Sequence, residues 1–78
     1  MNIMELKEMN QNRIVYLYRP EGAGEPGEIS YDLIRKVPEI IRRASEDPNE
    51  NYAKKAMLKV EDIVSANNLP MRCVQAWY

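Results

Sequence analysis

Residues 47–67, DPNENYAKKAMLKVEDIVSAN, carry the signals of a complete helix. Asp47 stands where an N-cap is expected, Pro48 follows at the first helical position, and Glu50 has the spacing of a capping box. At the other end, Asn67 tolerates the left-handed conformation that often terminates a helix. These local signals predict one helix that begins and ends within this stretch.

An apolar stripe runs along this predicted helix, which extends from Pro48 to Ala66. Its members recur at spacings of three and four residues, which places them on one face. They are Ala53, Ala56, Met57, Val60, Ile63 and Val64. The charged residues and Leu58 lie off this stripe. The helix therefore needs a core on one side, and the rest of the chain has to supply it.

The size and composition of the chain limit that core. With 78 residues the chain forms one domain near the lower limit for independent folding. Its single cysteine, Cys73, allows no internal disulfide, and without histidine there is no Cys/His zinc site. Eleven basic and twelve acidic residues leave a net charge of −1, a balance that favours neither nucleic acid nor a membrane surface as partner. We expect the core, or a second copy of the chain, to supply the stability.

The first twenty residues predict a β-hairpin. Residues 3–9 and 13–19 flank the polar joint at residues 10–12. The second run is rich in β-branched and aromatic side chains, whereas the first also fits a helical turn. In the second run, one predicted face carries Ile14, Tyr16 and Tyr18, and the other carries Val15 and Leu17.

Residues 20–27 predict a loop, because they hold all three glycines and two of the five prolines. They lack the Gly-Lys-Ser/Thr ending of a P-loop, so a hairpin connection is favoured over a phosphate cradle. Glu21, Glu25 and Glu28 lack the spacing of a calcium loop, and we expect no metal there. Residues 28–32 alternate in polarity and predict a short strand.

Residues 33–44 admit two interpretations. Their apolar residues fit a helical stripe, but Pro38 inside a helix would cost about 3 kcal/mol. A turn over residues 32–36 and an edge strand over residues 37–43 avoid that cost, because proline is tolerated on sheet edges. We favour the strand. Residues 71–78 alternate and predict an extended tail or a last strand.

Three stretches with distinctive residues span most of the chain. They are residues 18–32, YRPEGAGEPGEISYD, residues 52–56, YAKKA, and residues 74–78, VQAWY. They resemble a family of small uncharacterised bacterial proteins of about this length, mostly from Gram-positive species. The resemblance implies a turn and a strand before the helix, although Leu33-Ile34-Arg35 and the added Pro38 depart from the family's usual turn. It implies no activity.

One basic cluster and three aromatic residues form the candidate contact site. They are Arg35, Lys36, Arg42 and Arg43, with Tyr16, Tyr18 and Trp77. The cations suit phosphates, and the rings suit stacked bases where a sheet face is open. Arginines on an edge strand also serve as solvated residues that prevent aggregation, and the near-neutral charge favours this interpretation. Trp77 and Tyr78 are expected to pack against the sheet or the helix.

The sequence as a whole predicts an α+β fold, an antiparallel sheet of three to five strands with one long C-terminal helix packed on one face. Without histidine, Cys73 lacks the usual activating base, so we expect no enzyme and no cofactor. We expect a non-catalytic binding or structural module that meets a protein partner, or a second copy in a homodimer, through its sheet edge or outer sheet face. Nucleic-acid binding through Arg35 to Arg43 is the alternative. No signal peptide or transmembrane segment is recognisable, which with one free thiol predicts the cytoplasm.

Overall fold

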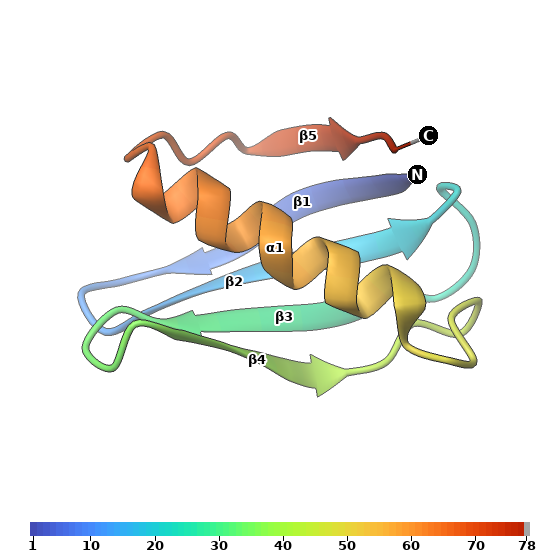
Figure 1. The fold of residues 1–78 in the computed structure, drawn as a ribbon, viewed down its shortest axis with the longest axis horizontal. Coiled ribbons are helices and arrows are strands. Elements are labelled where there is room, and N and C mark those ends of the chain that lie inside the picture. Colours follow the sequence, from blue (N-terminus) through green and yellow to red (C-terminus); the bar gives the residue numbers. More distant parts are fainter. Residues whose placement is uncertain (78) are drawn as a thin grey trace.

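A computed structural model describes residues 1–77, which form one antiparallel sheet crossed by one helix (Figure 1). The sheet has five strands in the order β4-β3-β2-β1-β5. The elements are β1 (Asn2–Met9), β2 (Arg13–Pro20), β3 (Gly27–Asp32), β4 (Val37–Arg42), α1 (Asn51–Ser65) and β5 (Arg72–Gln75). This confirms the α+β class. Within residues 1–77 there is no helix with the length and apolarity that a bilayer crossing requires.

The predicted long C-terminal helix is wrong in two respects. Helix α1 has 15 residues, beginning at Asn51 rather than Pro48, and β5 follows it in the chain. The late start has a local cause, since Glu50 adopts a left-handed conformation with φ of 59° and cannot lie inside the helix. Asp47 still acts as a cap from upstream, because its carboxylate accepts the backbone N–H groups of Tyr52 at 3.0 Å and Ala53 at 2.9 Å.

The end of α1 confirms the predicted stop at Asn67. This residue has a φ of 54°, and its N–H donates to the carbonyl of Val64 at 3.0 Å. The N–H of Asn68 donates to the carbonyl of Ile63 at 3.3 Å. This pair of bonds is the Schellman arrangement, which satisfies the last carbonyls of a helix.

Two asparagine- or aspartate-centred turns form the hairpins at one end of the sheet. Asn10 Oδ1 accepts the N–H groups of Asn12 and Arg13, which closes the predicted β1–β2 hairpin. Asp32 Oδ1 likewise accepts the N–H groups of Ile34 and Arg35 in the β3–β4 turn. Strand β4 then confirms the edge strand predicted over residues 37–43, to within one residue. Because β4 is an edge strand, Pro38 is accommodated there.

The predicted last strand is confirmed as β5, which pairs antiparallel with β1 at the opposite edge. Its four residues are fewer than the eight in the alternating stretch. Tyr78, the last residue of that stretch, lies outside the described residues.

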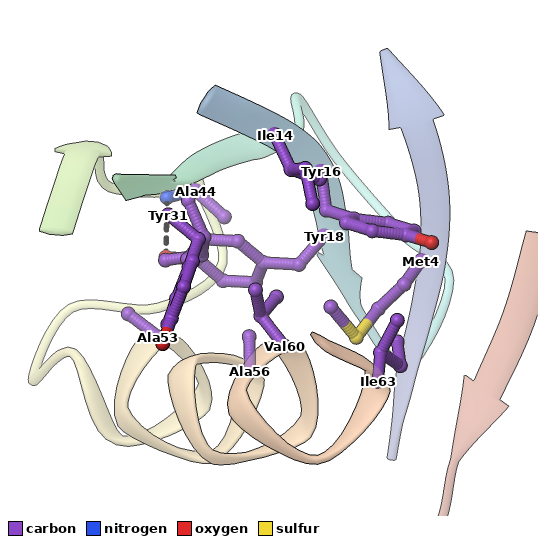
Figure 2. Packing of buried hydrophobic residues seen from close by; sticks show 11 residues of the cluster. Met4, Ile14, Tyr16, Tyr18, Tyr31, Ala44, Ala53, Ala56, Val60 and Ile63 are labelled. Carbon is purple, nitrogen blue, oxygen red and sulfur yellow. Dashed lines mark hydrogen bonds between the residues drawn. The ribbon is translucent and has the colours of Figure 1, made fainter. Parts of the chain in front are cut away.

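Helix α1 covers one face of the sheet, and the core lies between them (Figure 2). The buried helix residues are Ala53, Ala56, Val60 and Ile63, with Met57 and Val64 partly buried, so the predicted stripe is confirmed. The sheet contributes Met4, Ile14, Tyr16, Tyr18, Ile29 and Tyr31. The helix presents small alanines at two of its four buried positions, which leaves room for the tyrosine rings. Each fully buried tyrosine keeps its hydroxyl bonded, Tyr16 to the carbonyl of Pro70 at 2.6 Å and Tyr18 to Asp47 at 2.9 Å.

These two tyrosines predict a loss of stability in alkali. Burial raises the pKa of Tyr16 and the pKa of Tyr18 from the ordinary value of 10.0 to about 12. Below pH 10 both rings are protonated in the folded and unfolded states, so they cause no pH dependence. Above pH 10 the tyrosines of the unfolded chain lose their protons, whereas Tyr16 and Tyr18 of the folded protein keep theirs until about pH 12. We therefore expect the free energy of unfolding to fall over this range. Urea denaturation across this range, with tyrosine absorbance recorded alongside, measures it. If all tyrosines titrate near pH 10 while the urea midpoint stays constant, the prediction is wrong.

Candidate functional site

The four cations of the predicted basic cluster are separated in the structure. Arg35 and Lys36 lie in the β3–β4 turn, whereas Arg42 and Arg43 lie at the other end of β4. The six residues of that strand separate the two pairs by roughly 20 Å, at about 3.3 Å per residue. Arg42 is 3.4 Å from a carboxylate oxygen of Glu28, and Arg43 donates to the carbonyl of Pro48 at 3.0 Å. The chain therefore does not bring the four cations to one site.

The predicted aromatic contacts are also mostly removed from the surface. Tyr16 and Tyr18 are fully buried beneath α1, so they cannot stack on bases, which corrects that part of the expectation. Trp77 is half-buried and packs on Tyr52, with ring centroids 5.4 Å apart and a tilt of 59°. The ammonium of Lys55 lies 5.5 Å from the centre of the same ring. Trp77 thus packs against the N-terminal part of α1.

The outer sheet face, opposite α1, is closed at its centre by paired charges. Lys7 on β1 reaches Glu28 on β3, at 2.7 Å, and so crosses β2. Two more ion pairs join β1 to β2, Glu5 with Arg19 at 2.6 Å and Glu8 with Arg13 at 2.8 Å. The aliphatic parts of such side chains cover apolar atoms, and Val15 beneath them is only 3% exposed. This face is therefore polar and occupied at its middle.

Four backbone amides of the glycine-rich loop already donate hydrogen bonds within the protein. The N–H groups of Glu21, Gly22 and Ala23 donate to backbone carbonyls, and that of Glu25 donates to the hydroxyl of Ser45. Backbone amides used in this way do not converge on a phosphate. Of the loop's carboxylates, Glu21 binds the Met1 amino group and the Tyr52 hydroxyl. Within residues 1–77 no three side chains of Cys, Asp or Glu come close enough together to hold a metal.

Cys73 lies in an environment that disfavours a reactive thiolate. It lines a hollow of about 230 Å³ between α1 and β5, together with Lys59, Asp62 and Pro70. Burial raises the pKa of the Cys73 thiol, and the nearby charge of Lys59 offsets only part of that rise. A thiol held in its protonated form is a poor nucleophile.

The structure instead assembles an apolar surface at the end of the sheet where both hairpin turns lie. We call this surface the apolar end. It consists of Met9, Leu33 and Leu69, which line a hollow of about 180 Å³ together with Asn10, Ile14, Val64 and Asn67, and of Ile34, which follows Leu33 in the β3–β4 turn outside that lining. The two turns are joined by a bond from the N–H of Leu33 to the carbonyl of Asn12, at 2.9 Å. Ile34 is 72% exposed and Met9 is 58% exposed.

Sequence reasoning missed the apolar end. Its residues come from three segments that lie far apart in the chain, in the β1–β2 hairpin, the β3–β4 turn and the connection after α1. The available signal was the pair Leu33-Ile34, since two adjacent apolar residues are unusual in a turn that polar residues normally occupy. Exposed apolar residues beside a hollow make this end a candidate contact surface.

Comparisons with protein-family models, curated proteins and solved structures found no match to this chain. The candidate function therefore depends on the geometry of the described residues. That geometry offers a hollow with an exposed apolar rim, whereas the titratable side chains are mostly bonded to one another or dispersed.

Proposed function

We propose that the protein is a non-catalytic binding module that holds an apolar side chain of a protein partner at its apolar end. The observation that carries this proposal is a hollow lined by Met9, which is largely exposed, and by Leu33, whose neighbour in the turn, Ile34, is also largely exposed. Burying one leucine-sized side chain stabilises a complex by about 1.5–3 kcal/mol. We infer a partner segment with one leucine, methionine or phenylalanine anchor, and a modest affinity.

The chemistry of the chain supports binding rather than catalysis. Cys73 has a raised pKa, and no histidine is available to act as its base. The cytoplasm is the compartment we propose, because the only cysteine of the chain is free, as is usual for proteins in a reducing environment.

Nucleic acid is the alternative partner and has less support. Its proposed contacts are divided between the two ends of β4, and two of its three aromatic residues are buried. Phosphate contacts make binding fall steeply with salt. Binding of mixed oligonucleotides at low salt that weakens in this way would favour the alternative.

Selection of displayed peptides on the immobilised protein tests the apolar end. We expect selected peptides to share one apolar anchor and to bind the double variant Met9→Gln/Ile34→Gln at least 10-fold more weakly, since that variant removes apolar contact worth about 2 kcal/mol. Both positions are exposed, so the variant is expected to fold normally.

The matched control is Leu58→Gln, which replaces an apolar residue on α1 that is as exposed as Met9. It is expected to leave peptide binding unchanged. Peptides that bind the double variant as well as the original protein would contradict the proposal, as would a selection that yields no binder.

A further inference from the structure

The outward face of α1 carries one large apolar residue in the middle of a charged stripe. Leu58 is 58% exposed and lies away from the core. Residues three, four and seven positions before or after it share its face of the helix. They are Asn51, Lys54 and Lys55 on the N-terminal side and Glu61, Asp62 and Ser65 on the C-terminal side, all of them exposed.

The order of these charges is unfavourable for a helix alone. A helix has a partial positive charge at its N-terminus, where acidic side chains are stabilising, and a partial negative charge at its C-terminus. Helix α1 has no acidic residue in its first turn and no basic residue in its last. Lys54 and Lys55 lie in its first half, and Glu61 and Asp62 in its second. The five ion pairs found within residues 1–77 include none of these four side chains. Lys55 does contact the ring of Trp77 within the chain, but no ion pair among the described residues explains the order of the four charges.

The stripe is complementary to itself when it is reversed. If two copies of α1 lie antiparallel with Leu58 against Leu58, residues at equal distances before and after Leu58 face each other. The lysines at positions 54 and 55 of each copy then oppose the carboxylates at positions 61 and 62 of the other. Asn51 opposes Ser65, so that two uncharged polar residues meet at each end. An apolar centre within a charged rim is the usual composition of a protein interface.

We propose that the protein forms a twofold-symmetric dimer in which α1 of one copy packs antiparallel against α1 of a second copy, centred on Leu58. A twofold interface uses the same patch on both copies, and a patch of reversed complementarity is what such symmetry requires. Two helices of 15 residues form a small interface. We therefore expect a weak dimer with a dissociation constant of roughly 10–500 µM, which weakens as salt screens the charges.

Charge reversal tests this dimer by complementation. One variant is Lys54→Glu/Lys55→Glu, and the other is Glu61→Lys/Asp62→Lys. Each variant gives the four positions 54, 55, 61 and 62 charges of the same sign, so that like charges would face each other in the dimer. Each variant alone is therefore expected to be monomeric in sedimentation equilibrium from about 10 µM to 1 mM at low salt. Their mixture is expected to dimerise, because every contact then joins opposite charges. Both reversals suit the helix macrodipole, so circular dichroism is expected to show both variants folded.

Two further variants separate this dimer from the binding of peptides at the apolar end. Leu58→Gln is expected to raise the dissociation constant of the dimer at least 10-fold, whereas Met9→Gln/Ile34→Gln is expected to leave it unchanged. A protein that stays monomeric at about 1 mM and low salt would overturn the dimer. A dimer whose dissociation constant is unaffected by charge reversal would also overturn it. Peptide binding is measured separately, so either result leaves the proposed function to its own test.

Discussion

Gly27→Ala is expected to lower the free energy of unfolding by about 3 kcal/mol or more, although it adds a single methyl group. A Cβ atom at Gly27 would overlap Cε1 of the Tyr18 ring and would lie 2.7 Å from the backbone nitrogen of Ala44. The ring is held in place, because its hydroxyl accepts the N–H of Ala44 at 3.0 Å (Figure 2) and donates to Asp47 at 2.9 Å. For a domain of this size the melting temperature should fall by roughly 15 °C. Urea and thermal denaturation followed by circular dichroism measure the loss.

Two comparisons identify the cause of that loss. Gly22→Ala, in the connection before Gly27, adds the same methyl group where the nearest atom, Cγ1 of Ile3, is 3.3 Å away, so only a small shift of that side chain and the positive φ of 75° are unfavourable. It is expected to cost about 1 kcal/mol. In a Tyr18→Leu background the cost of Gly27→Ala should shrink, because the ring is gone. Additive costs in this double-mutant cycle would show that the ring of Tyr18 is not the cause.

Asp47→Ala is expected to destabilise the protein by about 3 kcal/mol, the second largest effect. The Asp47 side chain is almost completely buried and accepts three hydrogen bonds, from the hydroxyl of Tyr18 and from the N–H groups of Tyr52 and Ala53. Alanine would leave the two helix donors and the tyrosine hydroxyl without that acceptor. Because these donors belong to β2 and α1, we expect the first turn of α1 to lose its protection in amide hydrogen exchange as global stability falls.

The matched control is Glu46→Ala, which removes an exposed carboxylate from the same connection. Its effect should stay within about 0.5 kcal/mol. Asp47→Asn keeps one acceptor oxygen and is expected to lie between the two. If Asp47→Ala is no worse than Glu46→Ala, the buried carboxylate does not hold the helix to the sheet.

Asp47 also shows how far the sequence predicted the start of α1. The residue type and the proline after it correctly predicted a capping carboxylate, yet the helix begins at Asn51. The same carboxylate also binds Tyr18, which lies 29 residues earlier in the chain. A bond between such distant residues leaves no trace in local capping patterns, so the separation between this cap and the first helical residue could not be read from them.

The candidate site was the least predictable part of the protein. Arg35, Lys36, Arg42 and Arg43 are close in sequence, but an extended strand separates the two pairs. The apolar end is the reverse case, because Met9, Leu33 and Leu69 are distant in sequence but line the same hollow in the structure. Proximity along the chain is therefore a poor guide to proximity at a surface when β-strands intervene.

Features that depend on periodicity could be inferred from the amino acids alone. They include the α+β class, the buried stripe of α1 and the alternation in β2, because side chains repeat every 3.6 residues in a helix and every two in a strand. The edge strand was inferred from Pro38 instead, because the periodicity of residues 33–44 by itself fits a helix. The order of the strands, the packing of Tyr18 against Gly27 and the hollow at the apolar end were settled only by folding. Each of these depends on which distant segments pair and in what register, and local periodicity does not contain that information.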